Sequence, residues 1–278
     1  MSWLVIARKE FEDAVRSRLL WGVVAFVTVM VSVTFLIPLL VPAMESGVLA
    51  ALGGASEFAS MLVPIVALVA AYLAIAGERE SGSLRLLLGL EPSRRAVVAG
   101  KFVGRSAVVV VGLTAGFLLA GVVAWAVYGT VPAGAFLGVL LLTDALGVAF
   151  VGIAIGISAA SATRSRAMTI GIAAYLAFAL LWDLIPQGAH LAVFGGPPGA
   201  SAPAWFVFLQ GASPTGAYSA LVMNAIHATD PSYPAATTVL DGPVPFFVEW
   251  WAFAAIMVAW TVVPLALGSI AFERADLN

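Results

Sequence analysis

The stretch AGERESGSLRLLLGLEPSRRAVVAGKFVGR, residues 76–105, interrupts a chain that is otherwise strongly apolar. It contains six of the thirteen lysine and arginine residues, yet its centre is rich in leucine. Apolar runs precede and follow it, at 58–76 and 107–128. Because about 20 consecutive apolar residues cross a bilayer core, a charged stretch between two such runs indicates a loop at a membrane surface.

The composition of the whole chain is typical of an integral membrane protein. Of its 278 residues, 62% are hydrophobic and only 10% are charged, and the mean hydropathy is +1.05, whereas soluble domains carry roughly 25% charged residues. This length accommodates about six spans and no large additional soluble domain. The formal net charge of -2 argues against nucleic acid as a partner. The absence of cysteine excludes disulfides and cysteine-ligated metals.

Six apolar runs are long enough to span a membrane: 19–41, 58–76, 107–128, 135–160, 167–185 and 251–271. None shows the period-two alternation of a barrel strand, and lipid requires backbone groups to be satisfied within each segment. We therefore predict an all-α, polytopic membrane protein with six transmembrane helices within residues 19–278. Two runs contain the small-xxx-small packing pattern, GLTAG at 112–116 and GIAIG at 152–156, which alone does not identify an interface.

The lysines and arginines alternate between the two sides that these spans define. They occur in residues 1–18, in 77–106, in 161–166 and in the C-terminal tail. The other loops, at 42–57, 129–134 and 186–250, contain none. The positive-inside rule then places both termini in the cytoplasm, and we expect a multi-pass protein of the cell membrane.

The first eighteen residues carry too many charges for the apolar core of a cleaved signal peptide, so we expect them to be retained. Their apolar positions recur at helical spacing, at Leu4, Ala7, Phe11 and Val15. The spacing predicts an amphipathic interfacial helix over 1–18. Simple membrane anchoring and docking onto a partner both remain open for it.

The centre of the 77–106 loop is too apolar to remain exposed to solvent, because five leucines fall within seven residues. They are Leu84, Leu86, Leu87, Leu88 and Leu90. Gly82 allows a sharp exit from the second span, Pro92 ends a short helix, and Ser93 is suited to cap the helix that leads into the third span. A short helix parallel to the membrane is predicted, buried against lipid, the rest of the chain or another protein.

This loop resembles the first cytoplasmic loop of ABC-2-type transporter permeases, which reads Glu-Arg-x-x-Gly-(Thr/Ser)-Leu, then leucines, a Pro-Ser/Thr-Arg turn and Gly-Lys. The matching residues are Glu78, Arg79, Glu80, Gly82, Ser83, Leu84, Leu87, Leu88, Pro92, Arg94, Gly100 and Lys101. ARKEFEDAVRSR at 7–18 and SPTGAY at 213–218 are similar to other segments of that family. Within it, the sequence most resembles the permeases associated with nitrous-oxide-reductase maturation and their prokaryotic relatives.

The resemblance implies a membrane subunit that forms a homodimer, or a heterodimer with a similar permease, and docks a separate ATP-binding cassette ATPase. The matching residues would couple the two subunits, ATP and magnesium would be bound by the partner, and export would be the direction of transport. The chain agrees on one point, since it contains no G-x-x-x-x-G-K-[ST]: Gly100-Lys101 is preceded by Arg95 and followed by Phe102. We therefore expect no enzymatic activity, cofactor or metal in this chain.

Two carboxylates lie within or near the apolar runs. Asp144 falls near the middle of the fourth run, where it either lines a translocation path or makes a structural hydrogen bond with Thr143 or with another span. Asp183 is expected at the outer interface. An ion-coupled secondary transporter using Asp144 is one alternative function, although no internal repeat supports it. A non-transporting scaffold or sensor coupled to an ATPase is another.

The segment 186–250 differs from the other loops because it holds nine of the fifteen prolines. Ser213 and Pro214 fit the cap and first position of a helix. An external lid, as the resemblance implies, and a linker with one surface helix both remain open. His190 and His227 lie here without a cluster of other ligands, which argues against a metal site.

Overall fold

The computed structural model describes residues 3–16, 18–40, 47–83, 93–240 and 242–275. Over these ranges the chain is helical, and its only β-type pairing is an isolated bridge between Ala202 and Leu240. Six of the described helical segments are long and apolar enough to cross a membrane. The predicted all-α fold with six spans is confirmed.

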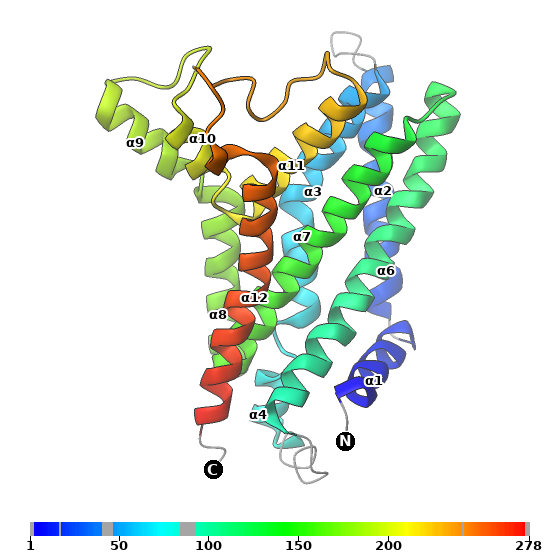
Figure 1. Ribbon diagram of the computed structural model, residues 1–278. Helices are drawn as coiled ribbons and strands as arrows, with labels where there is room; N and C mark the ends of the chain where they lie inside the picture. Colours follow the sequence, from blue (N-terminus) through cyan, green and yellow to red (C-terminus); the bar gives the residue numbers. More distant parts are fainter. Residues whose placement is uncertain (1–2, 17, 41–46, 84–92, 241, 276–278) are drawn as a thin grey trace.

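Figure 1 shows the order in which the helices follow one another along the chain. Their bounds are α1 Trp3–Arg16, α2 Arg18–Leu40, α3 Val48–Ala71, α4 Ala76–Ser81, α6 Arg94–Tyr128, α7 Ala133–Ala160, α8 Arg164–Tyr175, a π-helix Leu176–Leu181, α9 Leu184–Phe194, α10 Ala204–Gln210, α11 Pro214–Thr229, a 3-10 turn Phe246–Val248 and α12 Trp250–Arg274. The spans are α2, α3 continued by α4, α6, α7, α8 with its π-helix, and α12.

Helix α7 is the central helix of the bundle and packs against α3, α6, α11 and α12. In its most apolar window 67% of the residues are buried, against 17% in α12 at the periphery. Val139, Leu146 and Phe150 of α7 are fully buried. The core of the protein therefore surrounds α7.

Both small-residue patterns mark close helix contacts. A Cβ atom at Gly152 of α7 would lie 2.6 Å from the carbonyl oxygen of Thr261 in α12. A Cβ at Gly116 of α6 would lie 2.8 Å from Val27 of α2. Because no other side chain fits at these distances, glycine lets the backbones approach.

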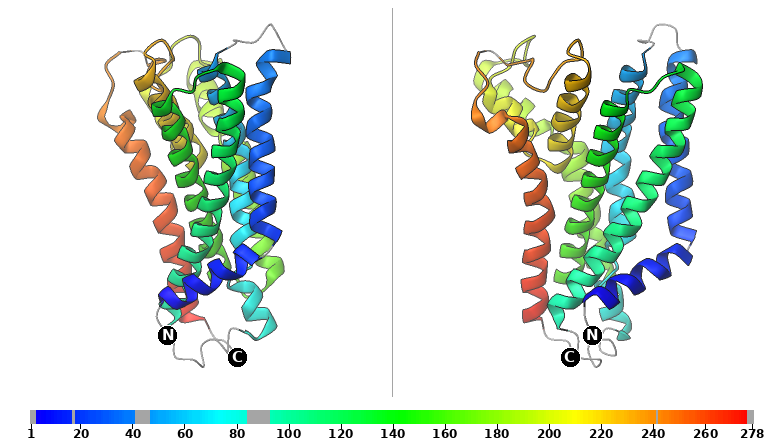
Figure 2. Two further views of the ribbon diagram at one scale, coloured as in Figure 1. Left: turned by 90° about the vertical axis from the view of Figure 1, so that its right-hand side faces the viewer. Right: turned by 45° about the vertical axis from the view of Figure 1, so that its right-hand side comes forward.

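The two ends of the bundle differ. At one end, which we call the terminal end, α1 crosses the base of the spans and α4 and the last turn of α12 lie nearby (Figure 2). At the other, the distal end, α10 lies above α8 and α12, and α9 projects away from the bundle.

The second span begins earlier than predicted. We expected it to start at residue 58, but α3 starts at Val48, so most of the predicted loop 42–57 is helix. Gly53, Gly54, Ser56 and Glu57 lower the hydropathy of residues 48–57. The sequence therefore indicates an apolar run only from residue 58. The helix persists over 48–57 because Leu52 and Ala55 are buried in the core.

The predicted loop 77–106 is also largely helical. Helix α4 occupies its first residues, and α6 already begins at Arg94. As predicted, Ser93 caps α6: its hydroxyl accepts a hydrogen bond from the Ala96 backbone N–H at 3.2 Å. Gly82 ends α4 in the left-handed conformation, with φ of 79°, which suits glycine. The leucine-rich centre, 84–92, lies outside the described residues.

The distal segment 186–250 contributes to the core. Helix α11 begins as predicted, with the Ser213 hydroxyl accepting from the Gly216 N–H at 2.9 Å. It packs against α7 and α12, and Ala217, Tyr218 and Ile226 are fully buried. The alternative of a linker with one surface helix is therefore wrong.

Candidate functional site

A cluster of charges, buried at Lys101 and Glu10 and partly exposed at Glu78 and Arg105, joins three helices at the terminal end. Lys101 of α6 is 1% exposed, and its Nζ lies 2.7 Å from Glu10 Oε1 of α1 and 2.7 Å from Glu78 Oε1 of α4. Arg105, one turn further along α6, lies 2.7 Å from Glu10 Oε2. We call these four residues the ionic hub. Its two cations and two anions balance, which is the condition for burying charge.

Two glycines beside the hub cations bring α1 into direct contact with α6. A Cβ at Gly100 would lie 2.7 Å from Ile6 Cβ, and one at Gly104 would lie 2.6 Å from Glu10 Cβ. The spacing of four residues places both glycines on one face of α6. The face of α1 that packs here is Ile6, Ala7, Glu10 and Ala14.

The packed face of α1 differs from its predicted apolar face, whose place at a membrane interface stays a prediction. Ala7 is buried as expected, but Leu4 and Val15 are exposed. The packed face instead includes Glu10, because the hub cations satisfy its charge. The exposed residues remain available to the membrane.

The hub cations control the ionisation of Glu10. Burial alone would raise the pKa of its carboxyl, but Lys101 and Arg105 outweigh that cost and hold the pKa below the ordinary value of 4.5. Glu10 is therefore ionised at neutral pH, as the ion pairs require.

A second contact stabilises a break in the second span. Helix α3 ends at Ala71 and α4 resumes at Ala76. The Ser158 hydroxyl of α7 accepts hydrogen bonds from the backbone N–H groups of Ile75 and Ala76, both at 3.0 Å. Ser158 is fully buried, so these N–H groups have no access to water and depend on it.

Helix α4 is also bound to the start of α8. Glu80 Oε2 accepts a hydrogen bond from the Arg164 backbone N–H at 2.7 Å, and the two side chains come within 3.9 Å. The Arg164 guanidinium donates to the carbonyl of Gly77 at 3.3 Å. A carboxylate at a helix N-terminus also complements the helix dipole.

On the other side of 84–92, the start of α6 is bound to the end of α12. The Arg94 guanidinium donates to three carbonyls there, Phe272 at 2.6 Å, Glu273 at 3.0 Å and Ala275 at 2.7 Å. Arg95 forms an ion pair with the Glu273 side chain. Arg94 thus satisfies carbonyls that a helix end leaves unpaired.

The predicted coupling residues therefore fall into four groups. Glu78, Gly100 and Lys101 belong to the hub and its packing, whereas Glu80 and Arg94 bind α8 and α12. Arg79, Gly82 and Ser83 lie in or just after α4, and the Ser83 hydroxyl is 2.9 Å from that of Ser81. Leu84, Leu87, Leu88 and Pro92 lie outside the described residues.

Sequence reasoning missed five residues that make the other contacts of this end. They are Glu10, Arg105, Ser158, Arg164 and Glu273. One signal was present: Lys101 and Arg105 lie one turn apart where α6 becomes apolar, and a buried cation requires an acid. The sequence did not indicate which acid.

The intramembrane carboxylate also has a partner on another span. Asp144 Oδ2 accepts a hydrogen bond from the Thr114 hydroxyl of α6 at 2.8 Å. Its other oxygen is buried without a partner among the described residues. Thr143 bonds instead to the hydroxyl of Tyr218 at 3.0 Å. The structural hydrogen bond to another span is present, and a role in translocation stays a prediction.

The histidines contact backbone rather than other potential ligands. The Nδ1 of His190 is 2.8 Å from the Gly196 carbonyl oxygen, and that of His227 is 2.6 Å from the Tyr233 carbonyl oxygen. Within the described ranges no group of three or more histidine, aspartate or glutamate residues could hold a metal ion.

Six apolar spans with α7 at their centre, and charged contacts gathered at one end, define a multi-pass membrane protein. A family model described as "ABC-2 family transporter protein" matches residues 4–277, and the chain belongs to this family.

Two curated relatives are similar over nearly their whole length. The "Probable ABC transporter permease protein NosY" of Stutzerimonas stutzeri is 28% identical over 280 residues, 97% of each chain. The protein of the same name from Pseudomonas aeruginosa is 29% identical over 291 residues, 98% of each chain. The chain is thus a membrane permease subunit of an ABC transporter, as the loop motif predicted.

Proposed function

We propose that this permease subunit couples ATP hydrolysis by a separate ATPase subunit to the export of a substrate, with residues 77–106 as the coupling element. The leucines of 84–92 would contact the ATPase. The observation that carries the proposal is that both flanks of this segment are bound to other helices of the bundle.

The entering flank, α4, contacts α1 and α6 through the ionic hub, α7 through Ser158 and α8 through Glu80. The leaving flank contacts α12 through Arg94 and Arg95. A displacement of 84–92 would therefore move several spans together rather than bend a free loop. Coupling requires this property, because interactions must link two arrangements of the spans.

Within this proposal the matched residues have different roles. Gly100 and Lys101 act as positioning residues, because they are buried against α1 and α4. Glu80 binds α8 and is partly exposed. It would therefore also border the surface that contacts the ATPase. Leu87 and Leu88 are the proposed anchors in the ATPase.

The assembly would contain two permease subunits, either two copies of this chain or this chain and a similar permease, each with an ATPase that binds ATP and magnesium. The terminal end would face the cytoplasm. All thirteen lysines and arginines are confined to residues 8–18, 79–105, 164–166 and 274, which supports this orientation in a cell membrane.

The orientation can be tested directly because the chain has no cysteine. Single cysteines are introduced at two exposed serines, Ser81 at the terminal end and Ser201 at the distal end. A membrane-impermeant maleimide should label Ser201→Cys in intact cells and Ser81→Cys only after permeabilisation. The reverse pattern would overturn the orientation.

The partner is tested by purifying the tagged protein from its native membrane in mild detergent and identifying what accompanies it by mass spectrometry. We expect a P-loop ATPase with the wild type and its loss from the double variant Leu87→Asp/Leu88→Asp. A matched control, Val193→Asp/Val244→Asp, changes two exposed aliphatic residues at the distal end and should retain the ATPase. Absence of an ATPase from the intact wild-type oligomer, or its retention by the leucine variant, would contradict the proposal.

The ion-coupled alternative makes a different prediction for Asp144. Under the proposal, Asp144→Asn retains a hydrogen-bond partner for Thr114 and leaves ATPase activity of the complex within about twofold. Abolished transport with a normal ATPase contact would favour ion coupling instead. A scaffold without transport would show ATPase binding but no substrate movement in reconstituted vesicles.

A further inference from the structure

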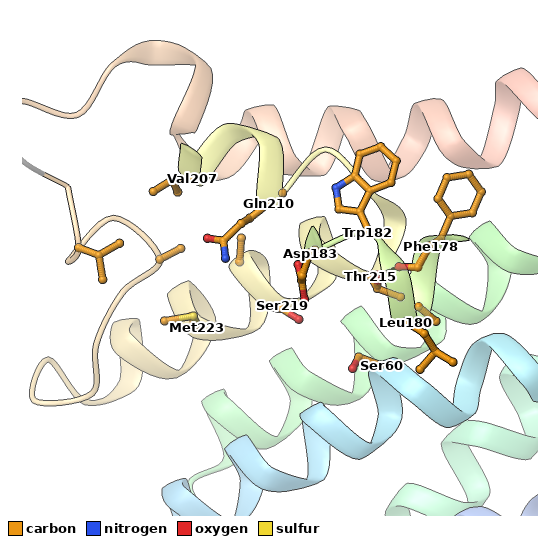
Figure 3. Close-up of a pocket in the computed structure, with 16 residues that line it drawn as sticks. Ser60, Phe178, Leu180, Trp182, Asp183, Val207, Gln210, Thr215, Ser219 and Met223 are labelled. Atoms are coloured by element: carbon orange, nitrogen blue, oxygen red, sulfur yellow. Dashed lines mark hydrogen bonds between the residues drawn. The ribbon is translucent and has the colours of Figure 1, made fainter. Parts of the chain in front are cut away.

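A cavity of about 330 Å³ lies in the distal half of the bundle (Figure 3), and no residue of the ionic hub lines it. Its walls come from α3, the π-helix, α10, α11 and the segment after α11. Small-molecule sites occupy roughly 300–1,000 Å³, so this cavity is large enough to hold a ligand.

Three polar side chains line the cavity without a protein partner. Asp183, Gln210 and Ser219 have no side-chain hydrogen bond or ion pair within the described ranges. They come from three different elements, and Figure 3 shows them around the same open space. Polar groups that converge on a cavity while remaining unpaired are the usual means by which a site orients a ligand.

The aromatic wall of the cavity is held in place by hydrogen bonds. The indole N–H of Trp182 donates to the Leu209 carbonyl at 2.8 Å, and the Phe178 carbonyl accepts from the Thr215 hydroxyl at 2.6 Å. The Phe178 ring packs edge-on to Trp260, with centroids 4.4 Å apart. The π-helix Leu176–Leu181 places Phe178 in this wall, and such helices are frequent at functional sites.

The charge of this region selects the sign of the ligand. No lysine or arginine occurs between residues 167 and 273. The acids of the distal half, Glu57, Asp183, Asp230 and Glu249, thus have no lysine or arginine partner there among the described residues. An unneutralised carboxylate in a hollow attracts cations and repels anions.

The surroundings of Asp183 favour an organic cation over a metal ion. Hard cations take six or more oxygen ligands, often including several carboxylates, whereas Asp183 is the one carboxylate among the lining residues. Aromatic rings beside a carboxylate are typical of ammonium recognition. Val207, Met223 and Val239 supply an apolar wall for the rest of the molecule.

We propose that this cavity binds an organic ammonium ion that carries an apolar group. Asp183 pairs with the charge, Phe178 and Trp182 form part of the surrounding wall, and the aliphatic wall contacts the apolar group. The site deepens the proposed function by giving the permease a ligand class, and in that respect it rests on it. Binding itself requires neither the ATPase nor transport.

The test uses the purified chain in lipid nanodiscs and benzyltrimethylammonium as the probe, with binding followed by saturation-transfer NMR. Phenylacetate, an aromatic of similar size and opposite charge, is the ligand control. We expect saturable binding of the cation and none of the anion. No saturable binding of the cation to the wild type, or equal binding of both, would overturn the proposal.

Two variants locate the site. Asp183→Asn should weaken cation binding at least about tenfold, and Met223→Trp should abolish it by filling the cavity. The matched control Glu249→Gln removes one negative charge from the same end outside the cavity, and binding should stay within about twofold. All variants are first checked for wild-type elution and thermal midpoint. Equal weakening by Glu249→Gln, or unchanged binding to both folded cavity variants, would refute the site. If the cation binds while no ATPase co-purifies, the proposed coupling fails and the site stands.

Discussion

The terminal and distal ends of this bundle use charge in opposite ways. At the terminal end, carboxylates find cations on other helices: Lys101 is 1% exposed and has two carboxylate partners within 2.7 Å. At the distal end, the carboxylates of Asp183 and Glu249 have no partner among the described residues, and contacts there are made by helix caps, aromatic rings and backbone acceptors.

The difference separates two tasks. Paired and buried charges hold α1, α4 and α6 in one geometry, because a displaced partner leaves an uncompensated charge. Such contacts suit an end that must move as a unit. Unpaired charges hold nothing in place and are free to meet a ligand. The following variants test whether the ends differ in this way.

The largest effect is expected from Lys101→Met. It leaves Glu10 and Glu78 without their shared cation, and breaking a buried pair costs about 3–5 kcal/mol of unfolding free energy. Unfolding in mixed detergent micelles measures the loss. Lys9→Ala, which removes an exposed cation of α1, should change stability by less than about 0.5 kcal/mol.

The cause is checked by removing the whole cluster. Lys101→Met combined with Glu10→Gln and Glu78→Gln should recover much of the lost stability, because no uncompensated charge remains. A triple variant as unstable as Lys101→Met alone would show that packing, not charge, dominates.

A smaller effect is expected from Ser158→Ala. Two buried N–H groups lose their acceptor, at about 1–3 kcal/mol each, and partial relaxation should limit the total to about 2–3 kcal/mol. Thermal unfolding followed by circular dichroism measures it. Ser161→Ala, whose hydroxyl bonds only within its own helix, should cost less than about 1 kcal/mol. Equal losses of stability in the two variants would show that the Ser158 contact at the α3–α4 break contributes no more than a hydroxyl bonded within its own helix.

At the distal end the comparable change is Ser213→Ala, which removes the cap of α11. Loss of an N-cap costs about 1 kcal/mol. Differential scanning calorimetry of the purified protein measures the shift in thermal midpoint, with exposed Ser201→Ala as the control. A loss as large as that of Lys101→Met would mean that the two ends contribute similar rigidity.

The smallest effect is a change in acid sensitivity. Because the folded-state pKa of Glu10 lies below 4.5, its stabilisation is complete above that pH and is lost as the pH falls through the folded value. The stability gap between wild type and Glu10→Gln should therefore narrow as the pH is lowered below about 4.5 in an unfolding series. A gap independent of pH for Glu10→Gln would contradict the hub.

Features set by neighbouring residues were predictable from the sequence. Six spans follow from local hydropathy, and Ser93, Gly82 and Ser213 act on backbone groups within a few residues of themselves. The motif of the 77–106 loop, a contiguous stretch of residues, was sufficient to indicate the family.

Features set by distant partners were not predictable. The break after Ala71 depends on Ser158, more than 80 residues away, and the burial of Lys101 depends on Glu10, 91 residues away. The start of α3 at Val48 depends on core packing that outweighs a weakly apolar turn. Contacts of this kind are chosen by the tertiary fold and leave little local signal.

The most direct test of coupling through the terminal end is the ATPase activity of the co-purified complex after changes at Glu80, the residue that binds the start of α8. Glu80→Lys should lower transport-linked ATPase activity at least about tenfold, whereas Glu80→Gln, which keeps an acceptor for the Arg164 N–H, should stay within about threefold. Glu12→Lys, at an exposed ion pair of α1, is the charge-matched control and should behave as wild type. Wild-type activity in an assembled Glu80→Lys complex would contradict the account.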